Sequence, residues 1–295
     1  MIKHFFGEAN AQIPSGAQAP KAIIAPHAGY NYSGANAALA YARLRPVAKT
    51  IKRVVLLGPS HRISLKGMAL SSANFFATPL GEVPIDYNGA QQITDLPQVQ
   101  VFDKCHAEEY SLEVQLPFLQ VVLDQFKVLP VVVGDCPPFQ IAEILDILWG
   151  GSETLIVISS DLSHFMDYNS ARDLDDVTAH AIETMSPENI NDNQACGRHP
   201  LKGFLALAKQ RNLHVKTLEL CNSGDTTGNK AKVVGYGSWA FFEQVDFEAK
   251  THALMNEHGK TLLKLAAQSI QHGLTTELPL AFNPAKYPKA LDAPG

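Results

Sequence analysis

Short, continuously apolar runs alternate with longer segments of helical periodicity through most of this chain. Each run is rich in β-branched residues and does not alternate with polar ones, which is typical of a strand buried on both faces. The runs are 21–26, 53–58, 128–134 and 154–159. Helical patterns follow at 35–44, 111–126, 139–149, 170–185 and 200–210. This alternation predicts an α/β fold with a mostly parallel central sheet flanked by helices.

The pattern changes toward the C-terminus. Segments 214–221 and 232–243 predict an antiparallel strand pair, joined by the glycine-rich turn 222–229, at one side of the sheet. From about residue 247 an amphipathic helix and then an irregular, proline-containing tail are indicated. We therefore predict a main domain at 1–247 and a C-terminal segment at 248–295. That segment has too few apolar side chains for a core of its own. The alternative is an ordinary terminal helix that completes the main domain.

Composition excludes several classes of function. The 295 residues carry a formal net charge of −5, which gives no electrostatic case for nucleic-acid binding. No signal peptide and no apolar run of membrane-spanning length is visible. The four cysteines are far apart and form no C-x-x-C pair, which argues against a disulfide framework. We therefore expect a cytoplasmic protein that binds neither nucleic acid nor membrane.

Three of the predicted strands run directly into a histidine, namely His27, His61 and His164. The carboxyl ends of parallel strands meet at one edge of a sheet, where ligands bind in open α/β folds. Imidazole is both a common metal ligand and a general base. We therefore predict that His27 and His61 hold a metal, and that His164 moves protons beside Asp161. The structural alternatives are solvated loop histidines and an Asp161 that caps the next helix.

Two further segments carry reactive side chains. Cys196 comes just before a predicted helix, a position that favours thiolate character in a metal ligand or nucleophile, although a small buried turn residue also fits. In segment 105–115, His106, Glu109 and Glu113 could face the site, but acids near a helix N-terminus are usually structural. Ser111 is the expected cap of that helix.

Six motifs occur together in a specific order. They are Ala25-Pro-His-Ala-Gly-Tyr-Asn-Tyr-Ser-Gly34, Leu57-Gly-Pro-Ser-His61, Glu109-Tyr-Ser-Leu-Glu-Val-Gln-Leu-Pro117, Ser159-Ser-Asp-Leu-Ser-His164, Cys196-Gly-Arg-His-Pro200 and Asn222-Ser-Gly-Asp225. Each motif is short, but the ordered set over about residues 20–245 is specific. It resembles the Memo family, including the bacterial proteins called AmmeMemoRadiSam system protein B.

The resemblance implies a fold similar to the LigB-like catalytic subunits of class III extradiol dioxygenases, which bind iron through two histidines and a carboxylate. In the Memo family, the equivalents of His27, His61 and Cys196 form the candidate metal site, with the cysteine in place of the carboxylate. Asp161 and His164 match the remaining pocket residues, with His164 at the position of the acid–base histidine. Iron (Fe²⁺) is the expected metal. Copper and zinc are also conceivable, because a thiolate is a softer ligand than a carboxylate.

The chain departs from the family pattern at one position. Many bacterial relatives read Glu-His-Ser where this chain reads Glu109-Tyr110-Ser111, which puts any role of that family histidine in doubt here. In addition, segment 258–270 resembles the opening helix of an AMMECR-type domain, so the C-terminal segment is predicted to be a truncated domain of that type.

Three functions compete at this point. The first is a metal-dependent, dioxygenase-like oxidoreductase that acts on an unknown small-molecule or peptide substrate. The second is a binding or accessory protein that works with a radical-SAM protein and an AMMECR-type protein. The third is a hydrolase with Cys196 as nucleophile and His164 or His199 as base. The hydrolase ranks last because it leaves two strand-end histidines unexplained.

Overall fold

The computed structural model describes residues 2–11, 13, 18–244 and 247–276. The chain divides into two compact units, Met1–Glu243 and Gln244–Gly295. The second unit contains helix α11 (Phe247–Thr276), and positions 277–295 lie outside the described residues. Whether the segment from 248 onward is a truncated domain stays a prediction. In the described part of the chain, no helix has both the length and the apolarity needed to cross a membrane.

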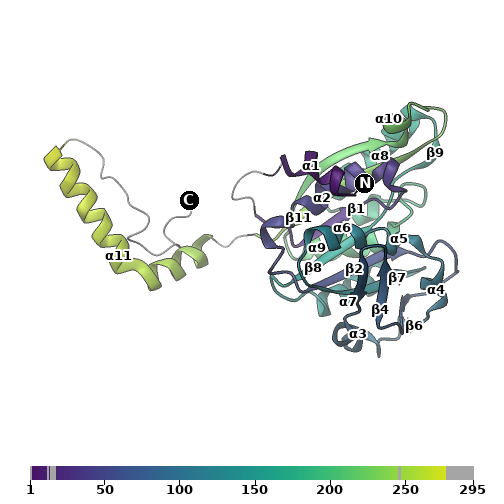
Figure 1. The fold of residues 1–295 in the computed structure, drawn as a ribbon, viewed down its shortest axis with the longest axis horizontal. Coiled ribbons are helices and arrows are strands. Elements are labelled where there is room, and N and C mark those ends of the chain that lie inside the picture. Colours follow the sequence, from purple (N-terminus) through teal and green to yellow (C-terminus); the bar gives the residue numbers. More distant parts are fainter. Residues whose placement is uncertain (1, 12, 14–17, 245–246, 277–295) are drawn as a thin grey trace. The chain divides into compact units, whose positions relative to one another are not determined.

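The first unit is an α/β fold built on a large mixed sheet (Figure 1). The strand order is β10-β11-β1-β8-β2-β7-β3-β6, and β9 pairs with β11. The sheet strands are β1 (Ala22–Ala25), β2 (Arg53–Pro59), β3 (Met68–Leu70), β6 (Val99–Val101), β7 (Lys127–Val133), β8 (Thr154–Ser159), β9 (His164–Met166), β10 (His214–Asn222) and β11 (Val233–Phe242). A separate hairpin consists of β4 (Phe75–Thr78) and β5 (Gly81–Pro84).

The centre of the sheet is parallel, and antiparallel pairs join the strands on its two sides to this centre. Strands β1, β8, β2 and β7 pair in parallel, as the apolar runs predict. On one side β11 is antiparallel to both β1 and β10, and on the other β3 is antiparallel to β7. Beyond this, β3 and β6 also pair in parallel. The prediction of a mostly parallel sheet is therefore correct for the centre and for the β3–β6 pair, and the whole sheet is mixed. The β10–β11 pair is antiparallel, as predicted, because its short link cannot form a crossover connection.

Helices cover both faces of the sheet. Their bounds are α1 (Ile2–Ala11), α2 (Tyr30–Ala42), α3 (Tyr87–Ile93), α4 (Lys104–Ala107), α5 (Tyr110–Glu113), α6 (Leu116–Val122), α7 (Pro138–Ile147), α8 (Tyr168–Glu183), α9 (Arg198–Gln210) and α10 (Ser223–Thr227). One buried apolar cluster includes side chains of α7, α8 and α9, and the other includes side chains of α1, α2 and α6. Neighbouring strand residues alternate between the clusters: Ile24 and Ile156 belong to the first, and Ile23 and Leu155 to the second. Burial on both faces explains why these runs are apolar throughout.

Candidate metal centre

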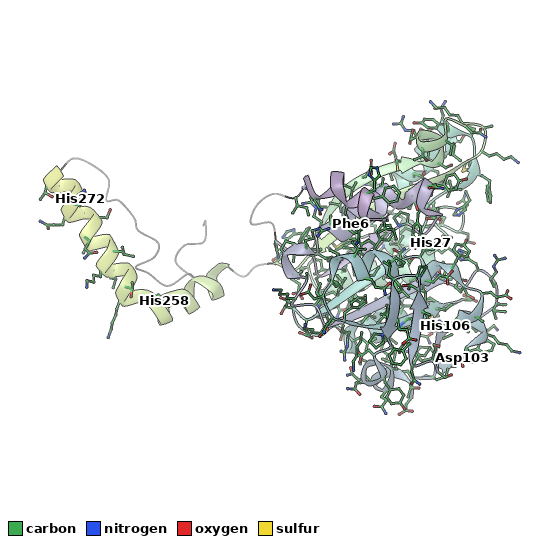
Figure 2. The ribbon with its side chains drawn as sticks, in the orientation of Figure 1. Phe6, His27, Asp103, His106, His258 and His272 are labelled. Atoms are coloured by element: carbon green, nitrogen blue, oxygen red, sulfur yellow. The ribbon has the colours of Figure 1, made fainter. Side chains whose placement is uncertain are left out.

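The residues predicted from the strand ends meet at one edge of the sheet. His27 follows β1, His61 follows β2, and Asp161 follows β8. One ligand atom from each of His27, His61 and Cys196 lies within 4.8 Å of the other two. His27 is only 1% exposed and lies inside the body of the first unit (Figure 2). Parallel pairing of β1, β8 and β2 is what brings these distant positions together.

Hydrogen bonds fix the tautomer of His27. Its Nδ1 lies 2.9 Å from the hydroxyl oxygen of Ser159, and that hydroxyl donates to the carbonyl oxygen of Ser111 at 2.6 Å. The Gln115 amide nitrogen donates to the same hydroxyl at 2.8 Å, while the Tyr41 hydroxyl donates to the Gln115 amide oxygen at 2.7 Å. Because a carbonyl can only accept, the single hydroxyl proton of Ser159 is used there. His27 Nδ1 therefore donates, and its Nε2 keeps a free lone pair.

A carboxylate fixes the tautomer of His61. Glu109 accepts from His61 Nδ1 at 2.8 Å and from the His61 backbone N–H at 2.6 Å. Burial alone would raise the pKa of Glu109, but hydrogen bonds from His61 and from the Ser111 backbone N–H lower it to about 2. The ionised carboxylate can only accept, so His61 also carries its proton on Nδ1 and presents Nε2. The ring of Tyr110 stacks on the His61 ring with centroids 5.0 Å apart.

Cys196 completes the cluster from the loop before α9. Its Sγ lies 3.2 Å from His27 Nε2. The next residue is Gly197, whose backbone N–H donates to the Ser160 hydroxyl at 3.0 Å. A Cβ at Gly197 would lie 2.6 Å from the Cβ of Ser160, so a glycine lets the loop approach the end of β8 this closely. Burial raises the pKa of the Cys196 thiol, and the negative charge of Asp161 raises it further.

Asp161 and His164 occupy different positions relative to the cluster. Asp161 is buried, and its Oδ1 accepts from the backbone N–H groups of His27 at 2.7 Å and Ala28 at 3.2 Å. Its Oδ2 lies 3.9 Å from His27 Nε2. The alternative that Asp161 caps the next helix is wrong, because Asp167 caps α8. His164 is exposed on β9. Burial lowers the pKa of His27, and a positive charge on His164 would lower that pKa further. The proposed roles of both residues in proton transfer stay predictions.

Several residues weighed from the sequence have other roles. Ser111 does not cap α5; the N-cap is Glu109, whose side chain accepts from the Ser111 N–H. The His106 ring nitrogen Nε2 contacts the carbonyl oxygen of Ala69 at 3.1 Å, and the Phe76 ring packs edge-on against that ring. His199 turns its Nδ1 toward the carbonyl oxygen of Cys136 at 3.3 Å. The contact of Glu109 with the His61 ring is not visible in the sequence, where a position near a helix N-terminus favours a structural role for this carboxylate.

The donor set fits a metal ion. Two imidazole nitrogens and one sulfur suit iron, copper or zinc, and three protein ligands leave a position open for another ligand. Tetrahedral ligands at about 2.1 and 2.3 Å from one ion lie about 3.5 Å apart, so the three side chains would close toward the ion by rotation. Each histidine also donates its Nδ1–H to an oxygen, Ser159 or Glu109, which is the usual arrangement behind metal-bound histidines.

Comparison with known proteins agrees with the motif analysis. Residues 1–240 match the family model described as Memo-like protein. A "MEMO1 family protein" of Aquifex aeolicus is 35% identical over 232 residues, covering 74% of this chain and 84% of that protein. A "MEMO1 family protein" of Sulfolobus acidocaldarius is 33% identical over 74% of this chain and 81% of its own length. The "Protein memo-1 homolog" of Caenorhabditis elegans is 31% identical, covering 64% of this chain and 61% of its own. The ordered motifs, the family match and these relatives together establish that this chain belongs to the Memo family.

Proposed function

We propose that His27, His61 and Cys196 bind one metal ion, Fe²⁺ by preference, and that the protein is a dioxygenase-like oxidoreductase. The observation that carries this proposal is the fixed tautomer of both rings, which leaves each Nε2 free beside the Cys196 sulfur. The proposal includes a fold similar to class III extradiol dioxygenases and a cytoplasmic location. Copper and zinc are the alternative metals for the same donor set.

In this proposal the residues of the site have different roles. Bound iron would supply redox chemistry and open coordination positions for a small-molecule or peptide substrate. His27 is held rigidly through Ser159 on its ring and Asp161 on its backbone N–H, so it would bind the metal without rearrangement. His61 is more exposed and would lie on the open side. His164, on the exposed strand β9, would exchange protons with solvent beside Asp161.

Two other functions remain as alternatives. A non-catalytic accessory protein would keep this pocket and work with a radical-SAM protein and an AMMECR-type protein, as the AmmeMemoRadiSam system protein B subtype implies. A cysteine hydrolase is favoured by one observation, the 3.2 Å contact between Cys196 Sγ and His27 Nε2. The base in that case would be His27, whose ring contacts the sulfur, in place of the His164 or His199 expected from the sequence; His199 faces Cys136. Burial raises the pKa of Cys196 and so opposes a free thiolate nucleophile, which places the hydrolase last.

Metal binding can be tested directly. Protein purified anaerobically is assayed for metal content, stripped, and titrated with Fe²⁺ in a calorimeter. We expect about one tight site per chain in the wild type, and loss of that site in a His27→Ala, His61→Ala, Cys196→Ser variant. His199→Ala and Cys221→Ser serve as matched controls, because they alter a histidine and a cysteine outside the cluster. Unchanged affinity in the triple variant, or equal losses in the controls, would refute the site.

A further inference from the structure

A small polar cavity of about 370 Å³ lies between α8, the end of β10 and the short helix α10. None of the candidate metal ligands lines it. Its wall includes Asp175 and Asp176 from α8, Asn222 from the end of β10, and Asp225 from α10. The size suits a small metabolite rather than a macromolecule.

Asp175 places a buried carboxylate at this cavity. The residue is 2% exposed, and its Oδ1 accepts from the backbone N–H of Ser163 at 3.0 Å. Its Oδ2 lies against Gly235 of β11, where any added Cβ would clash with the carboxylate. Among the residues that the structure describes, no lysine, arginine or histidine forms an ion pair with it. A buried carboxylate without a cation is unfavourable when ionised, so the site favours a ligand that brings positive charge.

Asn222 supplies a second and independent feature. It is 1% exposed, and its amide oxygen accepts from the Gly224 N–H at 2.9 Å as part of a capping box with Asp225. Its amide nitrogen Nδ2 is buried and has no hydrogen-bond partner among the described residues. Buried polar groups in folded proteins are nearly always paired. A ligand at this wall would therefore gain from an oxygen that accepts from Nδ2.

The charged side chains that line the cavity also favour a cationic ligand. Asp175, Asp176 and Asp225 contribute three carboxylates, whereas Arg172 is the single cationic side chain in the lining. The Arg172 guanidinium lies over the Tyr168 ring, 5.9 Å from its centroid. We propose that this cavity binds a small molecule that carries a primary ammonium group next to an acceptor oxygen. The ammonium group pairs with Asp175, and the oxygen accepts from Asn222 Nδ2. This inference is independent of metal binding by the histidine–cysteine cluster.

Calorimetric titration of the full chain at pH 7.5 and constant ionic strength tests the inference with four probes. Ethanolamine offers an ammonium and a hydroxyl, glycine an ammonium and a carboxylate, acetate no cation, and tetramethylammonium no N–H donor. We expect ethanolamine, glycine or both to bind, and neither acetate nor tetramethylammonium to do so. The better of the two amines identifies the acceptor oxygen as hydroxyl or carboxylate. Failure of both amines, or an equal response to tetramethylammonium, overturns the proposal.

Two substitutions in the cavity wall test whether the amine binds there. Asp175→Asn should weaken amine binding by about tenfold or more, because it removes the buried charge but keeps the acceptor for Ser163. Asn222→Ser should weaken it as well, since serine still caps α10 but lacks the amide NH₂. Asp173→Asn, an exposed α8 position outside the lining, is the matched control and should change nothing. Amine binding that persists in Asp175→Asn and in Asn222→Ser would show that it occurs elsewhere, and would refute this site.

Discussion

Neutralising Asp175 is expected to stabilise the protein at neutral pH. Burial raises the pKa of this carboxyl to about 6 from its ordinary 3.8, although the hydrogen bond from the Ser163 backbone N–H acts in the opposite direction. In Asp175→Asn the amide oxygen can still accept from the Ser163 N–H, and the side chain keeps its shape. The substitution therefore removes mainly the cost of a buried charge.

The size and sign of the effect follow from the two pKa values. Because the folded-state value lies above the unfolded one, the folded protein holds the proton more tightly. The favourable contribution of Asp175 is complete below about pH 4, and it is lost as the pH rises through about 6. The full difference between the two pKa values corresponds to about 3 kcal/mol in the free energy of unfolding. The side chain is too buried for solvent screening to reduce this energy greatly. The variant should match the wild type near pH 4 and exceed its stability by up to about 3 kcal/mol near pH 8.

Urea unfolding followed by tryptophan fluorescence measures this difference. The chain's two tryptophans, Trp149 and Trp239, both lie in the first unit, so the signal reports on that unit. Wild type and Asp175→Asn are compared at several pH values between about 4 and 8 in amine-free buffers, with the exposed Asp173→Asn as control. Other titrating groups cancel in the difference between variant and wild type. A difference that stays constant with pH, or that favours the wild type as the pH rises, would show that Asp175 is not penalised by burial.

Three further outcomes are expected. Glu109→Gln should lower Fe²⁺ affinity by about 10- to 100-fold in calorimetry because His61 loses its charged partner, whereas the exposed neighbour variant Glu108→Gln should not. His164→Ala should keep most of the metal affinity and lose any redox activity; loss of metal as complete as in His27→Ala would contradict its assigned role. Deleting 248–295 should shift the melting temperature of the first unit by less than about 2 °C in calorimetry, whereas a large loss would assign this segment to the main fold.

The central strands could be predicted because their sequences reflect burial on both faces. Residues of β1 and β8 alternate between two apolar clusters, so the runs are apolar throughout. The short strands β3, β6 and β9 span three residues each and carry too little pattern to be recognised. The helix predicted at 111–126 is divided into α5 and α6, and Pro117 lies in the first turn of the second helix. Local periodicity cannot show such a break when both halves remain apolar.

The part of the candidate site that could be predicted from the sequence is the part that the sheet topology determines. Strand ends identify His27, His61 and Asp161, because parallel strands share an edge whatever the details of packing. The contacts that orient the rings come from elsewhere. Ser159 is the last residue of β8, and Glu109 precedes a four-residue helix. The sequence explains Ser159 as a strand end and Glu109 as a helix cap, so only the tertiary structure reveals their contacts with the histidines.

Two acidic residues at this edge bear on the proposal that Cys196 is the third metal ligand. Asp161 lies close to His27 Nε2, but its Oδ1 is taken up by two backbone N–H groups. Both oxygens of Glu109 accept from the ring or backbone of His61. Neither carboxylate is among the three clustered ligands, although both place negative charge beside them. A cation at the cluster would be stabilised by these charges and would offset the burial that keeps the Cys196 thiol protonated. In the proposed site, Cys196 would supply the direct bond to the metal and the two carboxylates the compensating negative charge, which one ligating carboxylate supplies together in a two-histidine, one-carboxylate site.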